Sequence, residues 1–324
     1  MKILFIGTNR HDYLQDLTYS GLTKILGKQN VVEFQPNMRY HFPLKSYPKN
    51  LGYNNIDLHF ISNLFFRSFD CVVVSAAKPK CFEAYESMLP KLKPSVKTVF
   101  IDGGDFPAVG GDFTRLNQTE IYERVTAQRP FDFIFKREYL KDQVYDRNVH
   151  PLPFSINAGK YSSIPGKPFK YDVGFWAVES HPIRTQVLDY LQDRFDCKAN
   201  GTARDQAFKN YKRKGRFYFE ELKRSRISLN FRGTGWDTLR YWELLGLKCF
   251  MISQRLDIVI PDDFTEGSEI IYCENDLSNL EDLCSYYLKN EKAREKIATK
   301  AYEKALKYHT DEVRAKYILK NIGY

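Results

Sequence analysis

The stretch NFRGTGWDTLRYWELLGLKCFMIS, residues 230–253, carries the clearest structural pattern in the chain. An apolar strand ends at Arg232, a turn with two glycines follows, and apolar residues then recur at helical spacing as far as Gly246. A second apolar run, CFMIS (249–253), comes next. The order strand, tight turn, helix, strand is typical of a sheet with crossover helices, so this stretch predicts an α/β fold.

The first half of the chain shows the same alternation. Short runs rich in β-branched residues predict strands, and the segments between them carry apolar residues at helical spacing. The predicted strands are KILFIG (2–7), NVVEF (30–34), DCVVVSAA (70–77), KTVFIDGG (97–104) and FDFIFKRE (131–138). The predicted helical segments are LTYSGLTKILG (17–27), IDLHFISNLFF (56–66), FEAYESMLPKLK (82–93) and QTEIYERV (118–125). Together they predict a doubly wound, Rossmann-like unit.

A break without periodicity follows at residues 150–171, which contain four prolines, two glycines and a serine pair. The alternation then restarts. The expected elements are YDVGFWAV (171–178), a helix from Ile183 to about Phe195, RISLNFRG (226–233), a helix from Asp237 to Leu247, CFMIS and EIIYCE (269–274), with helices from Leu277 onward. We therefore predict two Rossmann-like domains, 1–155 and 156–308, that face each other across a cleft, and a closing helix, 309–324, that packs back on the first domain.

Targeting signals and cysteine usage indicate a cytoplasmic protein. The apolar run at the start is only five residues long, and no window approaches the roughly 18 apolar residues of a membrane span. The six cysteines form no C-x-x-C pair, and several lie in apolar strand-like runs, as buried free thiols do in a reducing compartment. A disulfide framework or a zinc site is not expected.

The formal charge of +9 is concentrated in one segment. Residues 198–226 hold ten lysines or arginines against Asp205, Glu220 and Glu221, a local excess of +7. Such a cluster could attract phosphates, nucleic acid or an acidic membrane surface. The alternative is a solvated face on helices and a loop. In either case we expect these side chains to be exposed, because their density is too high for burial without partners.

Ligand sites of open α/β sheets lie beyond the carboxyl ends of the strands, so the turns after strands were the first places to consider. GTNRHDY (7–13) lacks both G-x-G-x-x-G and G-K-[ST], which argues against a dinucleotide dehydrogenase and a P-loop enzyme. DGGDF (102–106) places two carboxylates around paired glycines. The turn at 232–238 is the most informative of the three.

At that turn, Gly233 and Gly235 leave room for a ligand beside the backbone, and Asp237 can cap the helix that follows. Free N–H groups at a helix start, together with Arg232 and Arg240, form a natural diphosphate site. Glu243, on the same helix face as Arg240, could accept both hydroxyls of a ribose. The alternative is that Arg240 and Glu243 form an ordinary exposed ion pair.

The run GTGWDTLRYWELLG (233–246) resembles the nucleotide-sugar signature of GT-B glycosyltransferases, [ST]-x-R-x-x-E-x-x-x-x-G, here Thr238, Arg240 and Glu243, with Gly246 following. It is similar to two groups, the CgeB-like, group 1-type transferases and the exostosin-like ones. LPFSIN (152–157), YDVGFWAVESHPIR (171–184) and HTDEVRAKYIL (309–319) also resemble segments of the CgeB-like group. The likeness is spread over most of residues 150–324. Ala177, where the family often has glycine, and Trp242, before the glutamate, depart from its pattern.

The resemblance implies an enzyme that transfers a sugar from a nucleotide-sugar, expected to be a UDP-sugar, with a donor site in the second domain and an acceptor site in the first. It implies no metal, in agreement with the lack of a D-x-D motif after any strand, so the diphosphate would be met by basic side chains and helix dipoles. The candidate donor-binding residues are Glu243, Arg240, Arg232, Thr238, Gly233, Gly235, Asp237 and Arg184.

A catalytic base would come from the first domain and face the cleft. Four residues lie after strands and are candidates, namely His11, Asp12, Asp102 and Asp105. The alternative for each of them is a loop cap or a turn former, because aspartate next to glycine is common in turns.

Three functions are compatible with these patterns. The first is a glycosyltransferase with a glycan, lipid-linked or secondary-metabolite acceptor. The second is a phage-type glycosyltransferase that modifies DNA bases, since residues 198–226 interleave Tyr211, Phe217 and Tyr218 with basic residues and resemble a phosphate-tracking surface. The third is a non-catalytic nucleotide-binding module on the same fold.

Overall fold

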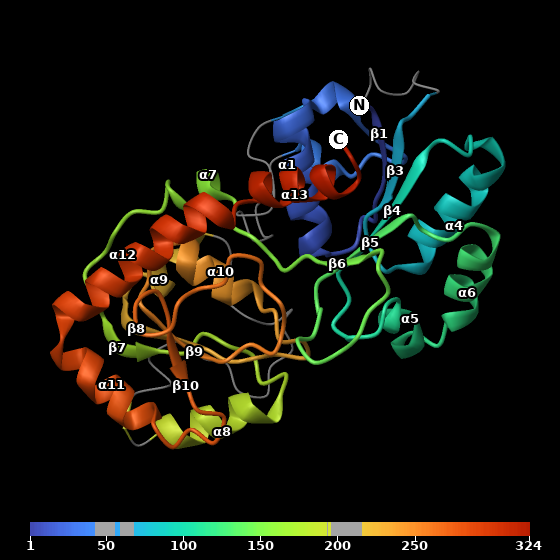
Figure 1. Cartoon of the computed structure of the whole chain (residues 1–324). Coiled ribbons are helices and arrows are strands. Elements are labelled where there is room, and N and C mark those ends of the chain that lie inside the picture. The colour runs from blue at the N-terminus through green and yellow to red at the C-terminus, as the bar shows by residue number, and fades with distance from the viewer. Residues whose placement is uncertain (43–55, 59–67, 193, 196–215) are drawn as a thin grey trace.

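The computed structural model describes residues 1–42, 56–58, 68–192, 194–195 and 216–324. These residues form two parallel sheets that lie in separate lobes (Figure 1). The six strands of the first sheet have the order β2-β1-β3-β4-β5-β6, and the four of the second have the order β10-β9-β8-β7. The first sheet contains β1 (Ile3–Ile6), β2 (Val31–Glu33), β3 (Cys71–Val74), β4 (Lys97–Asp102), β5 (Phe133–Lys136) and β6 (Val149–Pro151). The second contains β7 (Tyr171–Gly174), β8 (Ser225–Asn230), β9 (Met251–Gln254) and β10 (Ile271–Cys273).

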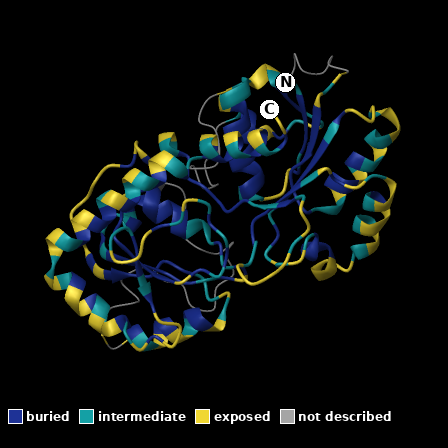
Figure 2. Ribbon diagram, viewed as in Figure 1, coloured by how far each residue is buried: buried dark blue, intermediate teal, exposed yellow. Residues whose placement is uncertain are grey.

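Helices cover both faces of the first sheet. Ile3 and Phe5 of β1 pack in one apolar cluster with α1, whereas Leu4 and Ile6 pack in another with α4. Because successive strand residues point to opposite faces, this division places α1 on one face and α4 on the other (Figure 1). The helices of this lobe are α1 (Tyr13–Leu26), α2 (Met38–His41), α4 (Pro79–Met88), α5 (Gly111–Arg115) and α6 (Thr119–Gln128). The strands are therefore buried on both faces, as Figure 2 shows.

The remaining helices belong to the second half of the chain. They are α7 (Ala158–Tyr161), α8 (Pro182–Leu191), α9 (Arg216–Leu222), α10 (Leu239–Gly246), α11 (Leu280–Lys289), α12 (Glu291–Tyr308) and α13 (Asp311–Asn321). Helices α11 and α12 carry exposed residues on their outer sides, whereas α10 has no exposed residue (Figure 2). No helix in the described part of the chain is long and apolar enough to cross a membrane.

The predicted fold class is confirmed, with two parallel α/β sheets, the first of them doubly wound, and a closing helix that returns to the first lobe. All ten strands of the two sheets were expected except β6, which lies at the start of the predicted break. Its residues Val149 to Pro151 form the edge of the first sheet, where the missing N–H of a proline costs no ladder hydrogen bond. No sheet residue lies between Pro151 and Tyr171, so we keep 1–155, 156–308 and 309–324 as our proposed boundaries.

Two expectations from the sequence concern residues outside this description. Most of the helical segment 56–66 and most of the basic segment 198–226 fall there, so the predicted exposure of that segment stays a prediction. The cysteines can be assessed for five positions. Cys71, Cys81, Cys249, Cys273 and Cys284 are buried free thiols, as predicted.

The closing helix α13 is held against α1 by close backbone contact and by one carboxylate. A Cβ placed on Gly21 of α1 would lie 2.1 Å from the carbonyl oxygen of Asp311. The Asp311 side chain, which is 1% exposed, accepts hydrogen bonds from Ser20 Oγ at 2.6 Å and from Lys24 Nζ at 2.7 Å. The first and last helices of the chain are thereby joined, and both termini lie in the first lobe (Figure 1).

We expect Gly21→Ala to destabilise the protein by about 1–3 kcal/mol, because the added methyl group forces α13 away from α1. Urea unfolding measures the effect as a lower midpoint. Gly166→Ala is the matched control, since nothing lies within 4 Å of a Cβ at that position. Equal midpoints for the two variants would contradict the close packing described here.

Candidate functional site

The carboxyl ends of β8, β9 and β10 meet at one edge of the second sheet and are joined by buried polar side chains. Asn230, at the end of β8, donates to Ser253 Oγ at 3.0 Å and accepts from Thr238 Oγ1 at 2.6 Å. Gln254, at the end of β9, accepts from the Arg232 backbone N–H at 3.2 Å and donates to Asn275 at 2.9 Å. This ladder of hydrogen bonds fixes the start of the turn that precedes α10.

The turn at 232–238 is compact and carries one cation on its outer side. The Arg232 guanidinium lies 4.0 Å above the centre of the Trp236 ring and donates to the Thr234 carbonyl at 3.0 Å. A Cβ on Gly233 would lie 3.2 Å from the Arg184 guanidinium, so a larger residue would crowd it. The predicted glycine positions are therefore required by neighbouring side chains of the protein itself.

Arg184, a predicted diphosphate ligand, shapes this turn instead of pointing at a ligand. Its guanidinium donates to the carbonyls of Phe231, Arg232 and Val178 and to Ser180 Oγ, at 2.8 to 3.3 Å. All of these acceptors are neutral. Burial, and next the charge of Arg240, lower the pKa of Arg184 to about 9.

Arg240 differs from Arg184 in its hydrogen bonds. Its Nε and Nη1 atoms are buried and have no hydrogen-bond partner among the described residues. The guanidinium lies 5.6 Å from the centre of the Phe175 ring. A buried, charged donor without an acceptor is costly, so this side chain is prepared for an anion.

Glu243 lies one turn further along α10 and is 4% exposed. It accepts a hydrogen bond from the Tyr218 hydroxyl at 3.1 Å. Burial, and next the Glu243 charge, raise the pKa of Tyr13, which lies at the start of α1 in the first lobe. Glu243 is therefore not part of an exposed ion pair. It lies where the two lobes meet, as a ligand-binding carboxylate would.

The sequence predicted Asp237 as the cap of α10, but the cap is Thr238. Thr238 Oγ1 accepts from the Tyr241 N–H, whereas Asp237 turns toward the interdomain segment. Its two oxygens accept from the Phe154 N–H at 2.6 Å and from Trp242 Nε1 at 2.7 Å. Burial raises the pKa of Asp237 to about 7, against these hydrogen bonds and the nearby Arg137 cation, which favour the carboxylate.

Glu138, which the sequence analysis missed, reaches this turn from the first lobe. It follows β5, is 1% exposed, and accepts from the N–H groups of Trp236 at 2.8 Å and Asp237 at 3.0 Å. A Cβ on Gly235 would lie 2.4 Å from its Oε1 atom, so only glycine fits there. The backbone donors expected to meet a diphosphate are thus held by a carboxylate of the protein. One feature of the sequence could have indicated Glu138. An apolar strand ends in three charged residues, Lys136, Arg137 and Glu138.

The segment after Glu138 extends the contact between the lobes. Leu140 and Ile258 form an isolated antiparallel bridge, and the Val259 N–H donates to the Tyr139 carbonyl at 2.8 Å. Lys141 Nζ donates to the Leu256 carbonyl at 2.9 Å. The loop after β9 is therefore held by the first lobe next to the 232–238 turn.

Two of the four candidate bases lie in the loop between β1 and α1. Asp12 is half-buried, and its Oδ1 atom accepts the Gln15 N–H at 3.1 Å as the cap of α1. Burial raises the pKa of Asp12, although the Lys78 charge acts in the opposite direction. His11 is exposed and its Nδ1 atom lies 3.2 Å from the Arg39 guanidinium.

The other two candidates are occupied by their own loop. Asp102 is fully buried, accepts the N–H groups of Gly104 and Gly110, and pairs with Lys136 at 3.1 Å. Asp105 forms an ion pair with the buried Arg137. The turn-forming alternative therefore describes Asp102 well, because no substrate can reach a side chain with no exposed surface.

Comparison with known proteins agrees with this geometry. Residues 186–320 match a protein-family model described as glycosyl transferase-like. This match lies within residues 150–324, where the sequence resemblance was found, and the two sheets have the arrangement of the GT-B fold. No curated protein sequence matches the chain significantly.

Several solved structures share the fold over the whole chain. An α-glucosyltransferase in complex with UDP and a 13-mer DNA containing an HMU base aligns with a TM-score of 0.61 and 12% identity, covering 100% of this chain and 99% of that one. HepE from Anabaena in complex with UDP and glucose aligns with a TM-score of 0.56 and 11% identity, covering 99% of each. Sucrose-phosphate synthase from Thermosynechococcus elongatus aligns with a TM-score of 0.55 and 8% identity, covering 99% and 98%.

We expect Glu138→Gln to loosen the 232–238 turn, because the amide keeps one acceptor and turns its NH₂ group toward the other N–H. Losing a hydrogen bond to a charged acceptor costs about 1.5–3 kcal/mol, so the amides of Trp236 and Asp237 should exchange with solvent at least about tenfold faster. Hydrogen exchange measures this rate. The control is Glu266→Gln, which breaks an exposed pair with Arg255. Unchanged protection at both amides in Glu138→Gln would show that the carboxylate does not hold the turn.

Proposed function

We propose that the chain transfers a sugar from a UDP-sugar, bound against the 232–238 turn and α10, to an acceptor held by the first lobe. The observation that carries this proposal is Arg240, whose Nε and Nη1 atoms are buried without a partner among the described residues. Its neighbour Arg184 is satisfied only by carbonyls and a hydroxyl. Two adjacent cations without a carboxylate partner among the described residues favour an anion from outside the protein, and a diphosphate supplies one.

The nucleotide would be oriented by Glu243. A buried carboxylate one turn after Arg240 is placed to accept the two hydroxyls of a ribose, and it already accepts the Tyr218 hydroxyl. UDP is the nucleotide in the complexes of the α-glucosyltransferase and of HepE, which supports UDP over other nucleotides for this chain. Arg232, on the outer side of the turn, is our second candidate for the diphosphate, and the leaving group would be stabilised by these cations without a metal ion.

Asp12 is our candidate for a base on the acceptor side. It lies at the carboxyl edge of the first sheet, next to Tyr13, which faces Glu243 of the second lobe. Its raised pKa suits a group that accepts a proton during transfer. We also propose a cytoplasmic location, supported by the five buried free cysteines.

The variant Glu243→Gln should bind UDP at least about tenfold more weakly, because a hydrogen-bonded charged group in a shielded site contributes about 1.5–3 kcal/mol. Calorimetry with UDP measures the affinity. Asp12→Asn, in contrast, should keep the affinity and lose turnover. The control is Glu281→Gln, which removes a half-exposed partner of Arg194. An unchanged affinity in folded Glu243→Gln would mean that the donor binds elsewhere.

In the same series, Arg240→Ala should lower kcat more than it weakens UDP binding, because a charge on the departing diphosphate develops chiefly in the transition state. Its fold should not suffer, since the lost Nε and Nη1 atoms have no partner among the described residues to leave unpaired. Without acceptor, we expect the wild type to release UDP from UDP-glucose, and Arg240→Ala to release it more slowly. This result would also argue against a non-catalytic module.

A nucleic-acid acceptor is the second candidate. Phe217 of α9 is 74% exposed and belongs to the segment 198–226, whose sequence is rich in lysine and arginine, so an aromatic ring is available for stacking. The DNA bound to the α-glucosyltransferase supports the same acceptor class for this chain. A glycan, lipid-linked or small-molecule acceptor is the alternative.

DNA binding should fall steeply with salt if phosphates are contacted, by about 10³–10⁵ between 50 and 200 mM for 6–10 contacts. Phe217→Ser should weaken the binding further while UDP affinity stays constant, and Tyr286→Ser, which removes another exposed ring, serves as the control. Transfer of labelled glucose to DNA with hydroxymethylated pyrimidines completes the test. Binding that does not depend on salt, without transfer, would exclude DNA as the acceptor.

A further inference from the structure

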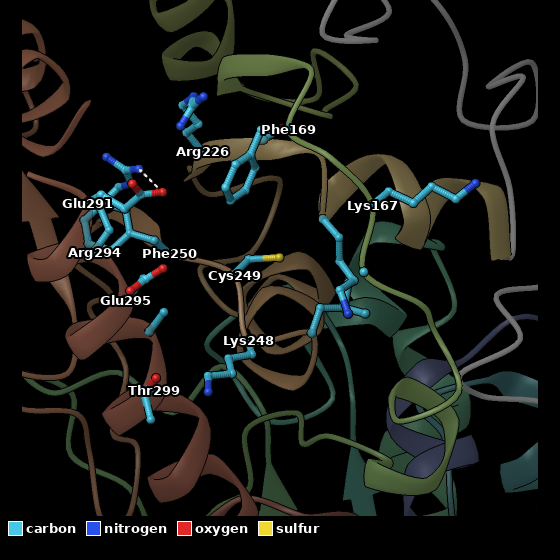
Figure 3. Close-up of a pocket in the computed structure, with 15 residues that line it drawn as sticks. Lys167, Phe169, Arg226, Lys248, Cys249, Phe250, Glu291, Arg294, Glu295 and Thr299 are labelled. Atoms are coloured by element: carbon cyan, nitrogen blue, oxygen red, sulfur yellow. Dashed lines mark ion pairs between the residues drawn. The ribbon is translucent and has the colours of Figure 1, made fainter. Parts of the chain in front are cut away.

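A cavity of about 420 Å³ lies in the second lobe, on the edge of the sheet opposite the proposed donor site (Figure 3). Its walls come from four segments, namely residues 166–169 between the lobes, Ser225 and Arg226 at the start of β8, residues 247–250 before β9, and the first half of α12. Because the sheet is parallel, the amino ends of β8 and β9 meet here, whereas the donor turn follows their carboxyl ends. The cavity is therefore separate from the proposed active site.

The lining of this cavity is rich in cations, with five basic side chains against two carboxylates. Three of the five already have carboxylate partners. Lys223 and Lys248 have none among the described residues. Lys223 donates to the Ile164 carbonyl at 3.0 Å, and the exposed side chain of Lys248 has no hydrogen bond or ion pair with a described residue. Two cations at the wall thus keep capacity for an external anion.

Lys248 also has an unusual backbone conformation. It follows α10 with a φ of 57°, and its N–H closes the helix by donating to the Leu245 carbonyl at 3.1 Å. Glycine is the usual residue at such a position, since a side chain is mildly strained in the left-handed region. From this position Lys248 lines the cavity (Figure 3).

The cavity also offers apolar surface beside these charges. Phe169, which is 49% exposed, lines the rim and carries the Arg226 guanidinium 5.1 Å from its ring centre. Leu247, Cys249 and Phe250 are almost fully buried below it. Figure 3 shows Phe169 and Arg226 at one end and Lys248 at the other. An apolar wall with cations at its edge favours a ligand that is flat and apolar in one part and anionic in another.

We propose that this cavity is a second binding site, which takes a small phosphate monoester with a flat apolar body. The phosphate would pair with Lys248 and Lys223, and the body would lie against Phe169. The volume is within the range of small-molecule sites. Because α12 lines the cavity and leads into α13, which packs on α1, the bound ligand would contact the helix that connects the two lobes.

Calorimetry with phenyl phosphate tests the site. Wild-type protein should bind one equivalent, and phenol, which lacks the phosphate, should bind at least about tenfold more weakly. Lys248→Gly should lose at least about tenfold in affinity while the fold is kept, because glycine relaxes the left-handed backbone. The matched control is Lys296→Ala, an exposed lysine of α12 that does not line the cavity.

Arg240→Ala distinguishes this site from the proposed donor site. The affinity for phenyl phosphate should be unchanged in that variant, and also unchanged in the wild type when saturating UDP is present. Both results support two separate sites. No binding by the wild type up to 10 mM phenyl phosphate, or equal affinity in Lys248→Gly and the wild type, overturns the proposal. Loss of binding in Arg240→Ala or with UDP would also overturn it, since the probe would then occupy the donor site.

Discussion

The hydrogen bonds of Glu138 with the turn before α10 hold the two lobes in register at the candidate site. A carboxylate with 1% exposure is costly unless several donors surround it, and here the lobe on the other side supplies two backbone N–H groups. Arg137, next to it in the chain, provides a guanidinium at 3.3 Å. The turn can receive this carboxylate only because Gly235 has no side chain. Charge, burial and a glycine therefore constrain one another across the interface.

Asp237 adds a further hydrogen bond near the same interface. While Glu138 reaches from the first lobe to the turn, Asp237 reaches back from the turn to the Phe154 N–H. Burial raises the pKa of Asp237 to about 7, so desolvation works against its negative charge. Two carboxylates that share Arg137 as their nearest cation cannot both remain charged without cost, so the hydrogen bonds to backbone N–H groups are essential to this arrangement. The proposed donor residues Arg240 and Glu243 follow directly on α10, and their placement depends on this turn.

The sequence predicted the parts of this structure that local patterns determine. Strand and helix periodicity gave both sheets, and the spacing of Thr238, Arg240 and Glu243 located the helix that carries the candidate site. It could not predict Glu138, because the partners of that residue lie about a hundred positions away and only the fold brings them together. For the same reason Asp237 was assigned to the cap of α10. Aspartate and threonine are both good caps, and the Phe154 N–H that binds Asp237 is not visible in the sequence. The strands and helices, whose patterns are local, were predicted, whereas the roles of Glu138 and Asp237, whose partners lie outside their own segment, were not.

Arg184 and Arg240 show why a site is better assigned from unmet hydrogen bonds than from residue type. The sequence treated them alike, as arginines near a glycine-rich turn. In the structure the Arg184 guanidinium donates hydrogen bonds to four neutral acceptors, and it thereby fixes the backbone at Phe231 and Arg232. Arg240, whose charge lowers the pKa of Arg184, keeps Nε and Nη1 buried without a partner in the described chain. Arg184 therefore stabilises the turn, whereas Arg240 keeps hydrogen-bond donors that an anion could use. A folded protein tolerates such an uncompensated cation where a ligand offsets its cost, which is the physical reason for proposing Arg240 as the diphosphate ligand.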